Sequence, residues 1–264
     1  MGGHANLPAS MTLSCQDLSV SVNGRTLVRN LSLTADPGGF VCILGPNGVG
    51  KTLTLHTLAG IRDFDTGAIQ LHGDDIKALD RRVIAQRLGL LLQAHDDAFP
   101  MTVLEAAMMG RHPHLGFWQW ESTADTDIAT NALTAMDLSD LTGRLTATLS
   151  GGERRRLAIA TLLVQEPDML LLDEPMNHLD PLHKLQVLGQ LSALADAGKT
   201  VIASLHDPAL AARYARQILL LFGDGEWEFG SATDMLTTDR LARLYGTPFA
   251  VFSRAGQEVL LPTL

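Results

Sequence analysis

Short runs of consecutive hydrophobic residues alternate with stretches of helical periodicity along most of the chain. Each apolar run is only four or five residues long and predicts a strand covered on both faces, as in a parallel sheet. The predicted strands are Phe40–Leu44, Leu88–Leu92, Met169–Leu172, Thr200–Ala203 and Ile218–Phe222. The helical stretches between them are Leu53–Leu58, about Lys77–Arg87, Leu182–Ala197 and Ala209–Arg216. The alternation predicts an α/β fold with a parallel sheet as its core.

The two ends of the chain have antiparallel patterns instead. Met11–Val22 and Thr26–Leu33 read as strands around the turn 23–24, an Asn-Gly hairpin signal. Ala68–Leu71 reads as a further short strand, so the N-terminal part is predicted to be an antiparallel β subdomain. Near the C-terminus, two short helices and a hairpin over Phe249–Leu261, turning at residues 255–256, are predicted.

The middle of the chain has no strand pattern between Ala94 and about Thr148. A capping box, Thr102-x-x-Glu105, predicts a helix start, and residues 125–136 form another helical stretch. We therefore expect one domain over residues 11–264. A helical subdomain at about 94–158 is inserted in its core, and residues from about 238 to 264 form a C-terminal extension.

Composition narrows the function. Hydrophobic residues make up 46% and charged residues 19%, which is typical of a globular protein. The longest apolar runs, of about five residues, are far shorter than the roughly 20 that a membrane helix needs. A net charge of −9 argues against broad nucleic-acid binding, so we expect no nucleic-acid partner. The two cysteines, Cys15 and Cys42, lie in predicted strands and are expected to be buried thiols.

A glycine-rich loop between the first apolar strand and its helix carries the strongest chemical signal. Its glycines let backbone N–H groups converge on phosphate oxygens, in front of the positive end of the helix. Lys51 supplies a cation for the β- and γ-phosphates, and the Thr52 hydroxyl is a ligand for Mg²⁺. The residues of this loop predicted to bind a nucleoside triphosphate are Gly45, Pro46, Asn47, Gly48, Val49, Gly50, Lys51 and Thr52.

A pair of carboxylates follows the strand Met169–Leu172. Asp173 stands at its carboxyl end, where ligands bind in open α/β sheets, and is predicted to hold Mg²⁺. Glu174 is predicted to polarise a water for attack on the γ-phosphate, a role worth roughly 10²–10⁴ in rate. The alternative is an acidic pair on the surface after a strand.

The segment Leu149-Ser-Gly-Gly-Glu153 permits two interpretations. Ser150-x-x-Glu153 is a capping box, which indicates a helix start and nothing more. Gly151 and Gly152 also leave the first helical N–H groups bare, and such a helix end attracts phosphate. The residues alone do not decide between the two.

Residues 45–52, 149–153 and 168–174 together resemble the ATP-binding subunit of ABC transporters, and the resemblance runs from about Met11 to Gly246. It implies a phosphate-loop, RecA-like core, with ATP and Mg²⁺ as cofactors. By the same resemblance Gln93 senses Mg²⁺ and the membrane partner. Asp180, in the segment Asn177–Asp180, belongs to the dimer interface, and His206 lies near the γ-phosphate.

The resemblance also implies partners and a location. Two copies face head to tail, with each ATP between the phosphate loop of one and residues 150–152 of the other. Integral membrane permease subunits bind the dimer and, indirectly, a periplasmic or lipid-anchored solute-binding protein takes part. The expected location is the cytoplasmic face of the bacterial inner membrane, as a peripheral subunit.

Three segments are similar to importers of iron–siderophore complexes, haem and cobalamin: residues 109–116, 177–181 and 244–246. An ABC exporter ATPase and a soluble ABC ATPase acting on nucleic acid remain the alternatives. The soluble class usually carries a second ATPase unit, a long coiled coil or zinc cysteines, and none is present in this sequence. A small-molecule kinase would use the same loop, but the segment 149–153 and Glu174 beside Asp173 argue against it.

Some residues depart from the family pattern or invite more than one interpretation. The family usually places an aromatic residue at the position of Val22 to stack on adenine, so we expect greater tolerance of GTP. The aromatic cluster Phe117, Trp118 and Trp120 is interpreted as local core, with a docking patch as the alternative. The basic run 154–156 is interpreted as a solvated helix face, and the histidines at 112 and 114 as part of a structural turn.

Overall fold

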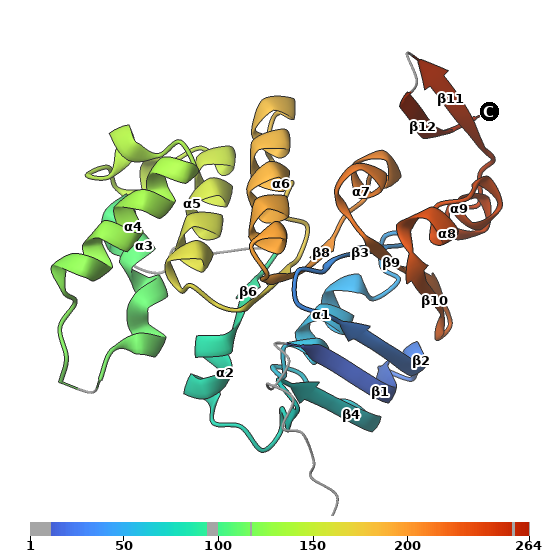
Figure 1. Ribbon diagram of the computed structural model, residues 1–264, viewed down its shortest axis with the longest axis horizontal. Helices are drawn as coiled ribbons and strands as arrows, with labels where there is room; N and C mark the ends of the chain where they lie inside the picture. The colour runs from blue at the N-terminus through green and yellow to red at the C-terminus, as the bar shows by residue number, and fades with distance from the viewer. Residues whose placement is uncertain (1–11, 94–99, 117, 255–256, 264) are drawn as a thin grey trace, which may run out of the picture.

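The computed structural model describes residues 12–93, 100–116, 118–254 and 257–263, and its central element is a six-stranded sheet (Figure 1). The strand order is β10-β9-β3-β8-β7-β6, and only β10 runs antiparallel to its neighbour. The strands are β3 (Phe40–Leu44), β6 (Leu88–Leu91), β7 (Met169–Leu172), β8 (Thr200–Ser204), β9 (Gln217–Gly223) and β10 (Glu226–Ser231). The predicted parallel core is confirmed.

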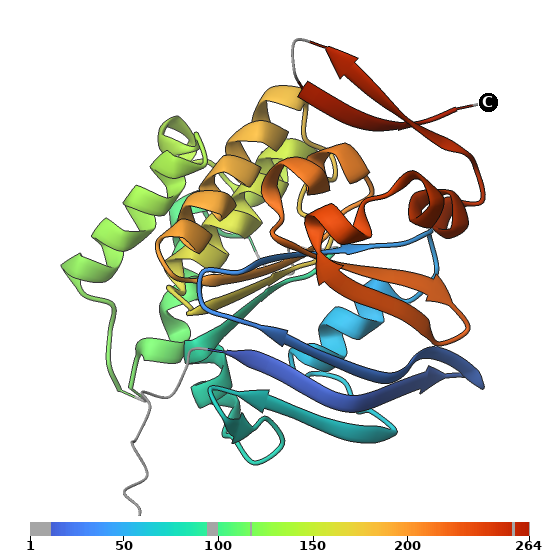
Figure 2. The ribbon, with the colours of Figure 1, turned by 45° about the vertical axis from the view of Figure 1, so that its right-hand side comes forward.

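A second, antiparallel sheet covers one face of this core, as predicted. Its order is β2-β1-β4-β5. The strands are β1 (Leu13–Val22), β2 (Arg25–Ala35), β4 (Thr66–Leu71) and β5 (Asp74–Asp75). The helix α1 (Lys51–Leu58) lies between the two sheets, where Leu55 and Leu58 are fully buried (Figure 2). The two-residue strand β5 was not predicted, because it has no room for a periodic pattern.

Helices cover the other face of the central sheet. The side chains of β3 show why both faces must be covered. Phe40, Cys42 and Leu44 pack in the cluster with these helices, whereas Val41 and Ile43 pack on the side of α1. All five residues of the strand are buried. The helices on this face are α5 (Gly151–Val164), α6 (Pro181–Asp196) and α7 (Pro208–Tyr214). The helices α3 (Val103–Met108) and α4 (Thr123–Ala135) pack against α5 (Figure 1).

The remaining elements are short. They are α2 (Arg81–Arg87), α8 (Ala232–Met235), α9 (Thr238–Tyr245), the 3₁₀ helices η1 (Met109–His114), η2 (Ser139–Leu141) and η3 (Thr146–Thr148), and the hairpin strands β11 (Phe249–Arg254) and β12 (Gln257–Pro262). The predicted capping box between Thr102 and Glu105 forms and starts α3. The predicted hairpin turn at 255–256 and residues 94–99 lie outside the described residues, and the subdomain boundaries stay predictions.

Both cysteines are free and buried, as predicted. Burial raises the pKa of the Cys15 thiol to about 11, and it raises the pKa of Cys42 still further above the usual range. Neither thiol is therefore ionised at neutral pH.

The local-core interpretation of the aromatic cluster is wrong for two of its members. Trp118 and Trp120 have exposed fractions of 88% and 86%. They lie in the chain between η1 and α4. The buried apolar residues of α4 are its own Ala129, Ala132 and Leu133. Phe117 lies outside the described residues.

The interpretation of the basic run as a solvated helix face is wrong for Arg155. All three guanidinium groups donate to backbone carbonyls. Arg154 bonds to Ala147 and Leu149, and Arg156 bonds to the main chain at 136 and 137. Arg155 is buried, with an exposed fraction of 6%. Arg155 therefore donates to main-chain oxygens inside the protein, whereas Arg154 is itself exposed.

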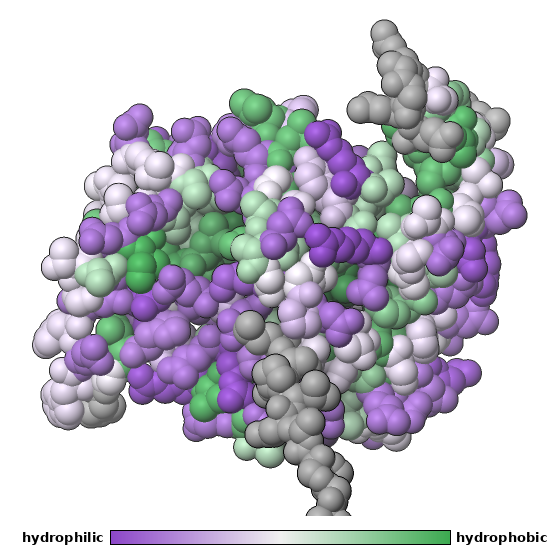
Figure 3. Space-filling model, in the orientation of Figure 1, coloured by the Kyte–Doolittle hydropathy of each residue, from purple (hydrophilic) through white to green (hydrophobic). Residues whose placement is uncertain are grey.

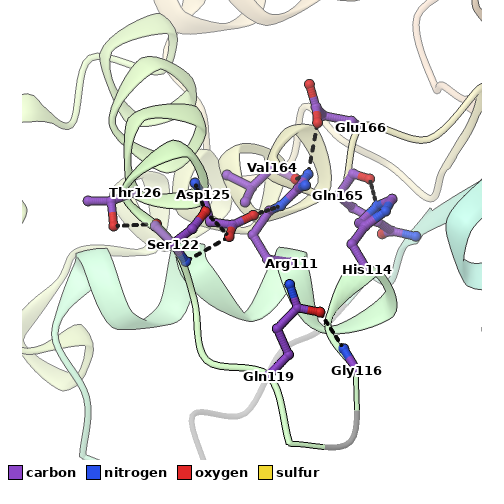
Figure 4. A network of polar contacts seen from close by, with 10 residues as sticks. All are labelled: Arg111, His114, Gly116, Gln119, Ser122, Asp125, Thr126, Val164, Gln165 and Glu166. Carbon is purple, nitrogen blue, oxygen red and sulfur yellow. Dashed lines mark hydrogen bonds and ion pairs between the residues drawn. The ribbon is translucent and has the colours of Figure 1, made fainter.

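A second buried arginine anchors η1 to its surroundings (Figure 4). Arg111 Nε lies 2.8 Å from Asp125 Oδ1, and its Nη1 lies 2.8 Å from Glu166 Oε2 and 3.0 Å from the carbonyl of Val164. Nearby, the His114 ring Nε2 lies 2.8 Å from the carbonyl of Gln165. His114 therefore makes a structural hydrogen bond between η1 and the residue that follows α5.

We expect the Asp125 carboxylate to contribute a pH-dependent part of the stability. Hydrogen bonds from Ser122, and then from Arg111, lower the pKa of Asp125 to about 2 from an ordinary 3.8. Its contribution is therefore complete above pH 3.8 and is lost as the pH falls toward 2. Asp125→Asn should reduce the free energy of unfolding by about 2 kcal/mol at pH 7. Urea unfolding should show that this difference shrinks below pH 4.

The exposed Asp127 on the same helix provides the control. Asp127→Asn should have the same unfolding midpoint as the wild type at both pH 7 and pH 3. A loss in Asp125→Asn that is the same at pH 3 and pH 7 would contradict a role for the ionised carboxylate.

Candidate active site

A pocket at the carboxyl edge of the central sheet gathers residues from five separate segments. These are β2, the loop after β3 together with the start of α1, and the segments that follow β6, β7 and β8. The lining residues are Leu27, Asn47, Gly48, Gly50, Lys51, Thr52, Leu53, Gln93, Glu174 and His206. Eight of the residues predicted from sequence to bind nucleotide or act in catalysis thus line one cavity, as expected for the open edge of a parallel sheet.

Two glycines of the loop, Gly45 and Gly50, have no room for a side chain. A Cβ on Gly45 would lie 2.6 Å from the carbonyl oxygen of Leu221, and one on Gly50 would lie 3.0 Å from Leu27. Gly50 also has a φ of 114°, which other residues rarely adopt. The loop backbone therefore lies close to its neighbours, and its N–H groups are available at the start of α1 for an anion.

Lys51 is folded into the loop that precedes it. Its Nζ donates to the carbonyls of Gly45 at 2.7 Å and Pro46 at 3.1 Å. Burial lowers the pKa of Lys51, and the negative charges of Glu174 and Asp173 oppose that shift. The ammonium is therefore held by neutral carbonyls beside two carboxylates, from where it can turn toward a phosphate.

Asp173 is fully buried and only half satisfied. Its Oδ1 accepts a hydrogen bond of 2.7 Å from Ser204 Oγ, while Oδ2 has no hydrogen-bond partner among the described residues. A buried carboxylate oxygen without a partner is costly, and a hard cation would satisfy it. Thr52 and Gln93 line the adjoining pocket with oxygen donors. The donor set fits Mg²⁺.

The Glu174 carboxylate accepts from three side chains. Its Oε1 lies 2.6 Å from His206 Nε2, and its Oε2 lies 2.9 Å from Gln93 Nε2 and 2.5 Å from Asn177 Nδ2. Burial raises the pKa of Glu174, but the hydrogen bonds from Asn177 and His206 outweigh it and leave the pKa below the ordinary value. Glu174 is therefore ionised at neutral pH and is an acceptor for a polarised water.

Ser204 is a residue of this site that sequence reasoning missed. Its hydroxyl donates to Asp173 and accepts from the backbone N–H of Glu174 at 2.8 Å. The predicted strand ended one residue earlier, at Ala203, which pairs with Leu172. A polar residue at the carboxyl end of the neighbouring strand was the available signal.

The other predicted residues do not line this pocket. Gly45, Pro46, Val49 and Asp173 adjoin its lining residues in the chain, whereas Ser150, Gly151, Gly152 and Asp180 belong to other segments. Ser150 caps α5, donating its N–H to Glu153 at 2.7 Å and accepting from the N–H of Glu153 at 3.3 Å. Asp180 caps α6 and accepts from His183. The two helix starts adjoin one another, because a Cβ on Gly151 would lie 3.6 Å from His178. They form a second polar surface on the same chain.

Comparison with known proteins agrees with this geometry. A family profile described as ABC transporter matches residues 28–177. The chain belongs to the ABC transporter family. As an ABC transporter ATP-binding protein it is an ATPase, and it binds ATP. The predicted fold class and the resemblance to this family are both confirmed.

Several relatives of this ABC protein have names that state a solute. The hemin import ATP-binding protein HmuV of Myxococcus xanthus is 39% identical over 230 residues, 84% of this chain and 85% of that protein. The cobalamin import ATP-binding protein BtuD of Halobacterium salinarum is 31% identical over 242 residues, 91% of this chain and 60% of that protein. A solved metal-chelate type ABC transporter, in an inward-facing conformation, has a TM-score of 0.84 and 27% identity. That match covers 96% of this chain and 98% of the solved one.

We expect the base preference of this ABC protein to be loose. Val22 lies at the end of β1, and none of the residues lining the described pocket is aromatic. Stacking of a base on an aromatic ring is worth about 1–3 kcal/mol. Val22→Tyr should therefore tighten the binding of ATP by about tenfold, measured in a competition assay. The wild type should tolerate GTP better than relatives that have the aromatic residue, and an equal or stronger preference for ATP would contradict this.

Proposed function

We propose that this ABC ATPase powers import of an iron–siderophore, haem or cobalamin type of solute. The observation that carries the catalytic part is the Glu174 carboxylate, held by Gln93, Asn177 and His206 beside the phosphate loop. The names of its relatives support the solute class, since they are hemin and cobalamin import proteins.

In this proposal each group of side chains has a separate role in hydrolysis. The loop N–H groups and Lys51 bind the phosphates, with the ammonium leaving its carbonyl partners for the β- and γ-oxygens. Glu174 accepts a hydrogen bond from the attacking water, and His206 and Gln93 orient that carboxylate. Thr52, Gln93 and Asp173 would hold Mg²⁺, which offsets phosphate charge when bound.

A second copy of the chain completes the site. Ser150, Gly151 and Gly152 lie outside the pocket of their own chain, and their bare helix start suits a phosphate. In a head-to-tail dimer they reach the ATP bound by the partner, and Asp180 lies at the same interface. Hydrolysis then requires two copies to close on the nucleotide.

We also propose that an apolar groove between α3 and α5 receives a cytoplasmic segment of the permease. Hydrophobic side chains are exposed over this region (Figure 3), and Met109 has an exposed fraction of 47%. The groove begins at Leu90 and Leu91, which is two residues before Gln93, so contact there can be transmitted to the catalytic site. Its lining residues are Leu90, Leu91, Met101, Ala106, Met109, Arg154, Leu157, Ala158, Thr161, Leu162 and Gln165.

In this proposal the chain works at the cytoplasmic face of the bacterial inner membrane as a peripheral subunit. Within the described ranges, no helix is both long and apolar enough to cross a bilayer. The permease subunits would form the membrane path, and a periplasmic or lipid-anchored binding protein would deliver the solute.

We expect Glu174→Gln to separate nucleotide binding from hydrolysis. The amide keeps the shape but cannot accept the proton of the water, so turnover should fall by about 10²–10⁴. ATP should still bind, and gel filtration with ATP should show a stabilised dimer. Lys51→Ala is the matched control that loses ATP affinity itself. Near-normal hydrolysis in Glu174→Gln would mean that another group acts as the base.

We expect Met109→Glu to weaken binding to the permease without changing the fold. A charge in the apolar groove should reduce co-purification with the membrane subunits in detergent, while the thermal midpoint of the isolated chain stays the same. The pair Trp118→Ser and Trp120→Ser tests whether the exposed aromatic loop also contributes. Undiminished co-purification of Met109→Glu would contradict docking at this groove.

A further inference from the structure

Arg155 is a buried cation whose hydrogen-bond partners are backbone carbonyls from two different strand ends. Its Nη1 donates to the carbonyl of Leu92 at 2.6 Å, at the end of β6. Its Nη2 donates to the carbonyls of Asp173 and of Glu174, the latter at 2.8 Å, directly after β7. The guanidinium thus spans the backbone that precedes Gln93 and the backbone that carries the catalytic carboxylates.

The contacts continue on both sides of these bonds. Nη1 also lies 3.5 Å from the carbonyl of Gln93, and Nε lies 3.4 Å from that of Pro175. The donors of one planar group therefore serve five main-chain oxygens, a pattern that the single ammonium of lysine cannot reproduce.

The turn after β7 gives this cation a specific task. Glu174 has a φ of 46°, a left-handed conformation that is unfavourable for a residue with a long side chain. The carbonyls of three successive residues, 173 to 175, accept from Arg155 at this turn. The guanidinium therefore stabilises the backbone conformation that aims the Glu174 side chain at His206 and Gln93.

Arg155 also belongs to α5, the helix whose first residues are the glycines Gly151 and Gly152. One turn of helix separates these glycines from the guanidinium. Its neighbours in sequence behave differently, because Arg154 and Arg156 bond to carbonyls at residues 147, 149, 136 and 137. Among the three arginines, Arg155 is the one that bonds to the ends of β6 and β7.

We propose that Arg155 is a positioning residue for ATP hydrolysis, which sets the backbone under Gln93 and Glu174 according to the position of α5. Nucleotide that contacts the N-terminus of α5, or permease that binds in its groove, would displace this helix. The displacement moves the guanidinium. The carbonyls that it holds then change the aim of the Glu174 carboxylate. The inference rests on the proposed role of Glu174.

The guanidinium is charged throughout this process. Burial lowers the pKa of Arg155, while the negative charges of Asp173 and Glu174 raise it. An arginine remains protonated at neutral pH in such surroundings, so the contacts are present in every state of the cycle in which α5 keeps its place.

Two substitutions test the proposal. Arg155→Lys keeps the charge but cannot bridge both strand ends, and Arg155→Met keeps the length of the side chain without any donor. We expect kcat of Arg155→Lys to fall by about tenfold and that of Arg155→Met by about a hundredfold. The KM for ATP should stay within about twofold, because the phosphate loop is untouched. Arg156→Lys, on the same helix, is the matched control and should keep the wild-type kcat.

A double-mutant cycle separates positioning from simple structural support. Turnover is expressed per ATP-binding site, so that misfolded protein does not count. If Arg155 acts through Gln93, then Gln93→Ala combined with Arg155→Lys should lose much less activity than the product of the single losses. Strictly multiplicative losses would overturn the proposal, as would a kcat that equals the wild type in Arg155→Lys.

The Glu174→Gln variant, measured alongside, distinguishes the two ways to fail. Lost turnover in Glu174→Gln with normal turnover in Arg155→Lys would overturn the role of Arg155 alone. Turnover that persists in Glu174→Gln would overturn the proposed base, and the inference about Arg155 with it.

Discussion

The burial of one carboxylate at the edge of a parallel sheet constrains the whole active site. Asp173 is fully buried because β7 has strands on both sides and layers on both faces. One of its oxygens is satisfied by Ser204, and the other has no partner within the described part of the chain. The polar groups of the site therefore gather at this edge, where a ligand can complete what the protein leaves unsatisfied.

The site is also divided between two surfaces of the chain. The phosphate loop, Gln93, Glu174 and His206 share one pocket, whereas the glycines at the start of α5 lie on another surface. Because of this separation, the pocket of one chain contains the hydrolytic groups. It does not contain every phosphate contact that the family resemblance implies. It also makes the position of α5 relative to the sheet a natural variable of the reaction.

The sequence was informative wherever a short local pattern determines the structure. Apolar runs predicted every parallel strand, and capping boxes predicted the starts of α3 and α5. The failures concern contacts between residues far apart in the chain. Arg155 bonds to residues about 20 and 60 positions away. A periodic pattern does not record such contacts, and it does not show that Trp118 is exposed.

The two buried thiols have a practical consequence for studying movement in this molecule. Cys15 and Cys42 are the only cysteines in the chain, both are inaccessible, and burial keeps both protonated. Thiol-directed reagents attack the thiolate at accessible positions, so the native background should be small. A spin label or fluorophore attached to a new surface cysteine could then report motions of α5 relative to the sheet, without first removing the native pair.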